Sequence, residues 1–156
     1  MDLPPDFRDL LEAFARESVE VVLVGGYAVA FHARPRATKD IDFVLGGEPA
    51  NLARAAAALT AFGAPPAVVA ATRTLAEGEV AYMGQPPMRI DLLRKIDAVD
   101  ARSLFARAVE TTIDGIRLRV ISLDDLIANK RAVARPQDLL DVELLERVRA
   151  ARDEAR

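Results

Sequence analysis

The chain has 156 residues, of which 51% are hydrophobic and 29% charged, as expected for one globular domain with its own core. A formal net charge of -3 gives no general cationic field, so nucleic acid could bind only through a local basic patch. No cysteine and a single histidine exclude disulfides, thiolate chemistry and histidine-rich metal sites. We expect a cytoplasmic protein with no membrane partner, because no signal-like segment opens the chain and no apolar run approaches the roughly 18 residues of a membrane span.

The first part of the chain predicts a helix, a strand, a glycine turn and a second helix. Residues 4–16 open with two prolines and carry apolar side chains at helical spacing. Residues 19–24 are rich in β-branched side chains and predict a buried strand. Gly25-Gly26 ends this strand before a small apolar helix over residues 27–32, and Pro35 breaks that helix.

The middle of the chain predicts a mixed sheet. Residues 40–45 read as the second strand, and residues 49–63 as an alanine-rich helix that begins with a proline. Residues 64–74 give no clear signal. Residues 79–83 and 88–93 flank a loop with two prolines and predict two antiparallel strands.

The last third predicts a hairpin followed by two helices. Asp114-Gly115, between two apolar β-branched runs, is the sequence signature of a two-residue hairpin turn. Ser122 followed by Asp125 resembles a capping box and predicts a helix to about residue 134. A final helix starts at Pro136, with an apolar face expected at Leu140, Leu144, Leu145 and Val148. We expect a single domain over residues 1–156, with a core at about 19–121 and C-terminal helices at about 122–152.

Asp40 and Asp42 stand inside a predicted strand, where aspartate is rare. Alternate residues of a strand share one face, so the two carboxylates lie on the same side, and the backbone positions that carry them are about 7 Å apart. Like charges at this spacing are costly unless a cation lies between them, and Mg²⁺ is bound by one or two carboxylates together with substrate phosphates. The pair predicts a metal site, with simple exposure of both carboxylates to water as the alternative.

Gly25-Gly26 lies between a predicted strand and a predicted helix. Glycines here let backbone N–H groups turn toward a ligand, and a helix N-terminus favours phosphate. The alternative is a tight turn with no ligand. The stretch is neither a dinucleotide fingerprint nor a Walker loop, because the third glycine and the Gly-Lys-Ser/Thr are missing. Together with the aspartates, it predicts one site for metal-bridged phosphates.

Val24-Gly25-Gly26, thirteen further residues and then Asp40-Ile41-Asp42-Phe43 resemble the signature of the nucleotidyltransferase superfamily that includes polymerase beta. Arg36-x-Thr38-x-Asp40 and the segment from Ile121 to Asp141 are similar to minimal bacterial enzymes related to abortive-infection toxins and lincosamide nucleotidyltransferases. The resemblance implies the nucleotidyltransferase fold of the α/β (α+β) class, with a mixed β-sheet flanked by helices and two C-terminal helices.

The resemblance also implies a third carboxylate on a later strand, and Asp91 interrupts the predicted strand at 88–93 as Asp40 and Asp42 interrupt theirs. The alternative for Asp91 is a surface ion pair with Arg89 or Arg94. In the family, the first two carboxylates hold the metal ions and the third completes the acidic set and helps to activate an acceptor hydroxyl. The implied cofactor is Mg²⁺, as two ions, with Mn²⁺ as a substitute, and the implied reaction moves a nucleoside monophosphate from an NTP to an acceptor and releases pyrophosphate.

The resemblance further implies phosphate contacts at Gly25, Gly26, Tyr27, Arg36 and Lys130. Many relatives carry serine at the position of Gly26, whose hydroxyl contacts a phosphate, so backbone N–H groups or Tyr27 would have to substitute here. Lys130 matches a lysine that related toxins place against the triphosphate, with a solvated surface charge as the alternative.

Other charged residues have structural interpretations. Arg36 could meet a phosphate or neutralise the aspartate pair. Asp138 and Asp141 are expected to complement the dipole of the last helix and to pair with Arg135 or Arg131.

Three classes of function remain open at this level. The first is an active nucleotidyltransferase whose acceptor is RNA or tRNA, a protein or a small molecule. The second is a non-catalytic, antitoxin-like partner subunit that binds a cognate protein, and the third is a metal-dependent phosphohydrolase or nuclease. We expect the acceptor pocket in residues 64–87 and the C-terminal helices, and the aromatic content of 5% indicates no stacking platform for bases.

Overall fold

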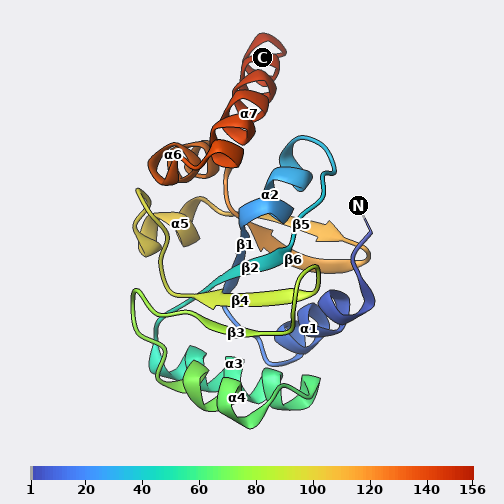
Figure 1. The fold of residues 1–156 in the computed structure, drawn as a ribbon, viewed down its shortest axis with the longest axis vertical. Coiled ribbons are helices and arrows are strands. Elements are labelled where there is room, and N and C mark those ends of the chain that lie inside the picture. Colours follow the sequence, from blue (N-terminus) through green and yellow to red (C-terminus); the bar gives the residue numbers. More distant parts are fainter. Residues whose placement is uncertain (1) are drawn as a thin grey trace.

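The computed structural model describes residues 2–156, which form seven helices and six strands (Figure 1). In chain order these elements are α1 (Pro5–Arg16), β1 (Val21–Val24), α2 (Gly25–His32), β2 (Asp40–Leu45), α3 (Pro49–Phe62), α4 (Pro66–Arg73), β3 (Ala81–Met83), β4 (Arg89–Leu93), α5 (Ala101–Arg107), β5 (Val109–Ile113), β6 (Ile116–Val120), α6 (Leu123–Val133) and α7 (Pro136–Glu154). None of these helices is both long and apolar enough to cross a membrane.

The six strands form one mixed sheet in the order β3-β4-β2-β1-β6-β5. The neighbours β4 and β2 are parallel, as are β1 and β6, whereas the other three pairs are antiparallel. The expectation of a mixed sheet with an antiparallel pair at β3 and β4 is therefore confirmed. The hairpin between β5 and β6 is confirmed as well, because Asp114 and Gly115 both adopt the positive φ angles that a two-residue turn requires.

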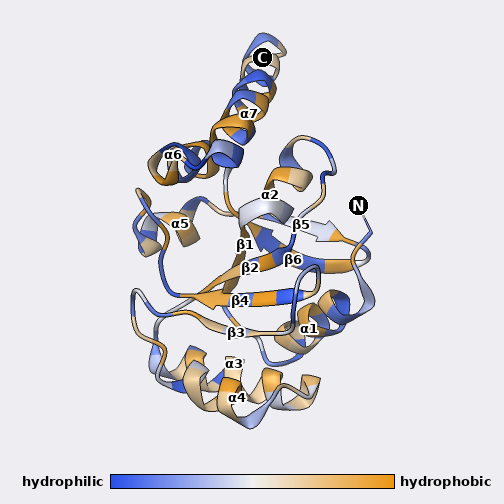
Figure 2. Ribbon diagram, in the orientation of Figure 1, coloured by the Kyte–Doolittle hydropathy of each residue, from blue (hydrophilic) through white to orange (hydrophobic). Residues whose placement is uncertain are grey.

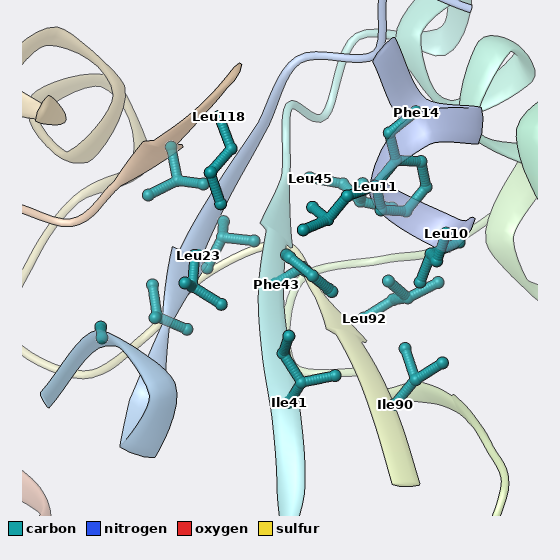
Figure 3. Close-up of a cluster of buried hydrophobic side chains, with 14 of the residues drawn as sticks. Leu10, Leu11, Phe14, Leu23, Ile41, Phe43, Leu45, Ile90, Leu92 and Leu118 are labelled. Carbon is teal, nitrogen blue, oxygen red and sulfur yellow. The ribbon is translucent and has the colours of Figure 1, made fainter. Parts of the chain in front are cut away.

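One face of the sheet is apolar and packs against α1. Leu10, Leu11 and Phe14 of α1 point toward side chains of β2 and β4, and Phe14 meets Phe43 edge to face at 5.7 Å between ring centroids (Figure 3). The helices α3 and α4 pack on each other, and α3 packs on α1. The hydropathy colouring shows polar and apolar residues alternating along β2 and β4 (Figure 2). This packing fixes the backbone of β2 from the apolar side.

The helix α2 packs on β1 and β2, and the C-terminal helices α6 and α7 join the sheet through α2. The pair α6 and α7 lies at the far end of the molecule from α3 and α4 (Figure 1), and α2 packs against both α6 and α7. Ser122 caps α6 by accepting a hydrogen bond from the backbone N–H of Asp125 at 3.2 Å, which confirms the predicted cap.

Three elements differ from the expectations. Residues 66–73 form α4, in a stretch with no clear sequence signal, and α5 was not predicted at all; its N-cap is Asp100, whose side chain accepts from the backbone N–H of Ser103. The apolar face predicted for the last helix is wrong at Leu140, which is 61% exposed. The buried residues of α7 are Asp138, Asp141 and Leu145, so two carboxylates occupy positions on the buried face of the helix. Leu140 lies on the solvent-exposed face.

Candidate active site

The register of three strands brings Asp42 and Asp91 side by side. Asp42 on β2 pairs with Asp91 on the parallel neighbour β4, and with Val24 on the antiparallel neighbour β1. Paired residues point to the same face of a sheet, so both carboxylates lie on the face opposite α1. Asp40, two residues before Asp42, shares that face.

The three aspartates converge on one point. Asp40, Asp42 and Asp91 each offer a carboxylate oxygen, and these oxygens lie within 4.8 Å of one another. Asp91 also accepts a hydrogen bond from Arg89 Nε at 2.7 Å, so the ion pair expected as the alternative for Asp91 is present within the same cluster. Arg94 instead donates to the backbone carbonyl of Leu75. Oxygen ligands at this spacing suit a hard divalent cation such as Mg²⁺.

The electrostatics of the cluster favour a bound cation. Burial, together with the charges of Asp40 and Asp91, raises the pKa of Asp42 to about 7. Burial and the charge of Asp91 also raise the pKa of Asp40. Three carboxylates at this distance are therefore costly to ionise together, and a divalent ion that binds them removes the repulsion. The residues present fit a metal.

The glycine turn lies directly against Asp42. Gly25 has φ +69°, and a Cβ atom placed on it would lie 2.2 Å from Oδ2 of Asp42, so this position requires glycine. Gly26 has no such φ restriction; a Cβ there would lie 3.1 Å from Cβ of Thr38 and 3.2 Å from Nη2 of Arg36. The helix α2 begins at Gly25, so its N-terminal N–H groups lie beside the carboxylate cluster.

Lys130 is buried in an ion-pair network that the sequence did not indicate. Its side chain is 7% exposed, and Nζ lies 3.0 Å from Oδ1 of Asp138 and 3.1 Å from Oδ2 of Asp141. The alternative of a solvated charge is therefore wrong for Lys130. Asp138 pairs with Arg135 as expected, whereas Arg131 pairs with Glu146 and not with either aspartate.

The same network reaches the loop before β2. Arg36 Nη2 donates to Oδ2 of Asp141 at 2.8 Å, so Asp141 binds Arg36 and Lys130 with one carboxylate. Burial alone would raise the pKa of Asp138, but hydrogen bonds from Arg135 and Lys130 outweigh burial and lower it to about 2. The buried carboxylate of Asp141 thus holds the helix α7 to the segment that carries Arg36.

These groups line one cleft of about 760 Å³. The lining includes the three aspartates, both glycines and the predicted phosphate ligands Arg36 and Lys130. Tyr27 does not line it; its ring packs edge to face on Phe7 at 5.5 Å between centroids. Further basic side chains at the cleft are Lys39, Lys95 and Arg135.

The mixed sheet, the glycine turn and the converging carboxylates define a nucleotidyltransferase. The chain belongs to the family described as nucleotidyl transferase AbiEii toxins of type IV toxin–antitoxin systems, whose profile matches residues 8–156. It is an enzyme of the nucleoside monophosphate transfer class.

Solved structures share the fold at low sequence identity. The crystal structure of ANT(2″)-Ia in complex with adenylyl-2″-tobramycin superposes with a TM-score of 0.59 at 17% identity and covers 96% of this chain and 97% of that one. The solution structure of the antibiotic-resistance factor ANT(2″)-Ia gives a TM-score of 0.57 at 19% identity and covers 96% of this chain and 90% of that one. No curated protein matches the sequence significantly.

Proposed function

We propose that the protein transfers a nucleoside monophosphate from a Mg²⁺-bound NTP to an acceptor hydroxyl at the cleft between the sheet and α6–α7. The observation that carries this proposal is the convergence of Asp40, Asp42 and Asp91 within 4.8 Å, beside a glycine turn at a helix N-terminus. When bound by these carboxylates, divalent ions would neutralise charge on the attacking and leaving oxygens.

The chain's own residues would orient the substrates. The acceptor oxygen attacks the α-phosphorus, the bond from phosphorus to the bridging oxygen breaks, and pyrophosphate leaves. Asp91 takes the proton of the acceptor hydroxyl. Backbone N–H groups at Gly25 and Gly26 bind phosphate oxygens, and Arg36 and Lys130, fixed by Asp141, contribute positive charge on the same side of the cleft.

The cleft favours an anionic acceptor over a polycationic one. The crystal structure of ANT(2″)-Ia contains an adenylylated tobramycin, which is an aminoglycoside. Once metal ions neutralise the triad, the basic side chains still outnumber the carboxylates around the cleft. The basic side chains are Arg36, Lys39, Lys95, Lys130 and Arg135, and the carboxylates are Asp97, Asp138 and Asp141, which pairs with Arg36 and Lys130. Such a lining repels an aminoglycoside.

The family also supports a biological role. We assign the chain to the toxin side of a toxin–antitoxin pair in the cytoplasm, where NTP and Mg²⁺ are available, with a cognate antitoxin as its genetic partner. Induced expression should arrest growth, and expression of Asp42→Asn should not. Growth arrest by both proteins would contradict a toxicity that depends on nucleotidyl transfer.

The reaction itself is tested with two isotopic labels. Purified protein is incubated with cell extract and either α-³²P or γ-³²P NTP, with Asp42→Asn as the control. Nucleotidyl transfer puts the α label, and not the γ label, on a macromolecule or small molecule. Release of labelled nucleotide with no labelled acceptor would instead indicate a phosphohydrolase, and no turnover with either label would refute the proposed activity.

A further inference from the structure

Two side chains beside Asp91, Tyr82 and Arg89, have no part in the proposed mechanism. Tyr82 on β3 is the register partner of Asp91 on β4, and Arg89 precedes Asp91 by two residues on the same strand. Both therefore point to the sheet face that carries the triad. The guanidinium of Arg89 joins them, because its Nε donates to Asp91 and its Cζ lies 4.2 Å from the centre of the Tyr82 ring.

The position of this pair follows from the strand order. The paired residues Val24, Asp42, Asp91 and Tyr82 form a row across β1, β2, β4 and β3. The glycine turn begins directly after Val24 at one end of the row, and Tyr82 lies on the edge strand at the other end. The acidic cluster thus separates the turn from the aromatic ring.

In-line transfer assigns the two ends of the row to different substrates. The attacking and leaving oxygens lie on opposite sides of the α-phosphorus. This step rests on the proposed function, in which the leaving pyrophosphate is held at Gly25-Gly26. The acceptor therefore approaches from the end occupied by Asp91 and Tyr82.

The chemistry of the pair is suited to a ring and a phosphate. Tyr82 is 55% exposed, and it is the aromatic member of the exposed large hydrophobic side chains in residues 2–156. Arg89 covers part of the ring, and within the same residues its two Nη groups donate no hydrogen bond. An exposed aromatic ring stacks on nucleobases, and a free guanidinium edge binds phosphate through two parallel hydrogen bonds.

We propose that Tyr82 and Arg89 form the acceptor subsite: Tyr82 stacks on a planar base of the acceptor, and Arg89 binds a phosphate near the reacting hydroxyl. The acceptor then has the chemistry of a nucleotide, either free or at the end of an RNA strand. Arg89 also ties this subsite to Asp91, which takes the hydroxyl proton. The low aromatic content of the sequence did not indicate this pair, because only the register of β3 and β4 brings Tyr82 beside Arg89 and Asp91.

Binding titrations test this subsite apart from activity. The probes are the four nucleoside 5′-monophosphates and a labelled single-stranded RNA 10-mer, added to intact protein whose NTP site is first saturated with Mg²⁺ and a non-hydrolysable NTP analogue. We expect Tyr82→Ala and Arg89→Ala to weaken binding of the engaged probe about tenfold or more. Tyr82→Phe, which keeps the ring, should bind within about twofold of the wild type. The matched control is Arg117→Ala on β6, which removes another exposed strand arginine far from the cleft.

The outcomes separate the two proposals. Selective loss in Tyr82→Ala and Arg89→Ala supports the subsite, and the probe that binds identifies the source as free nucleotide or RNA end. Wild-type protein that binds neither probe, or equal binding by wild type and Tyr82→Ala, overturns the subsite while leaving analogue binding intact. Failure of wild type to bind the analogue with Mg²⁺ refutes the proposed function, and the subsite with it.

Discussion

On β2, the side chains of Ile41, Phe43 and Leu45 are completely buried against α1, whereas those of Asp40 and Asp42, one residue away, face the cleft. Because successive side chains of a strand point to opposite faces, the apolar core residues lie on one face of β2 and the candidate metal ligands on the other. The apolar face fixes the backbone, and the backbone holds like charges together although they repel. Substitutions on the cleft face should therefore lower activity and leave the fold intact, whereas substitutions on the apolar face should lower the stability of the fold.

The largest expected effect is on activity. Asp42→Asn removes a charge from the carboxylate cluster and should lower nucleotidyl transfer by about 10²- to 10³-fold, the scale for loss of a preorganised electrostatic group. The fold should be kept, because the side chain has nearly the same shape. Transfer of α-³²P label measures the first effect and thermal unfolding the second. A variant that keeps activity would remove Asp42 from the mechanism.

One residue further along, Phe43→Ala should show the reverse. Truncation of a completely buried phenylalanine costs about 3–5 kcal/mol of unfolding free energy. Urea unfolding measures this loss. Among molecules that remain folded, Mg²⁺-dependent nucleotide binding should persist; a stable Phe43→Ala protein with no nucleotide binding would show that the two faces are not separate.

The pH dependence of stability gives a further test of the carboxylate cluster on the cleft face of β2. Because the pKa of Asp42 is raised to about 7 in the metal-free fold, its contribution to stability is present below the ordinary value near 3.8 and is lost as the pH rises through 7. Between pH 4 and pH 8 the wild type should lose up to about 4 kcal/mol relative to Asp42→Asn. Unfolding curves of both proteins at a series of pH values measure this difference. Saturating Mg²⁺ should reverse it, and a constant difference across the pH range would contradict the raised pKa.

The ion-pair network of α6 and α7 should respond differently from surface pairs. Lys130→Met leaves Asp138 and Asp141 buried with one partner fewer and should cost about 3 kcal/mol. The matched control is Arg131→Met on the same helix, which breaks an exposed pair with Glu146 and should cost less than about 1 kcal/mol. Equal losses in denaturant unfolding would show that the Lys130 network is not an integral part of the fold.

The two glycines of the turn should respond differently, with only a small effect at Gly26. Gly25→Ala introduces a Cβ against Asp42 at a positive φ and should cost more than about 2 kcal/mol. Gly26→Ser needs only small shifts of Thr38 and Arg36 and should change stability by less than about 1 kcal/mol. Thermal unfolding of both variants compares them, and a larger loss in Gly26→Ser would contradict the geometry of the turn.

The central part of the site could be predicted because its residues violate local rules. Asp40, Asp42 and Asp91 interrupt apolar strands, and Gly25-Gly26 stands at a strand end, so each is visible in one short stretch of sequence. The alternation of strand faces placed Asp40 and Asp42 on one side of the sheet. Asp91 was added from the family resemblance, and the pairing of β2 with β4 brings it beside Asp42. The mixed sheet and the last hairpin were predicted from turn residues in the same way.

The rest depends on pairings that no local pattern specifies. The burial of Lys130 with Asp138 and Asp141 needs the packing of α7 on α6, and on a helix such charges are usually solvated. That packing also explains the wrong prediction for Leu140. Tyr82 and Arg89 were not chosen as site residues, because their place beside Asp91 depends on the register of β3 and β4.

The central claim is a metal-dependent nucleotide site built on Asp42, and it is tested most directly by calorimetric titration. Wild-type protein and Asp42→Asn are each titrated with the four non-hydrolysable NTP analogues, with and without Mg²⁺. We predict binding of at least one analogue that requires Mg²⁺ and is lost in the folded variant. No binding by the folded wild type, or Mg²⁺-independent binding that Asp42→Asn retains, would contradict this claim.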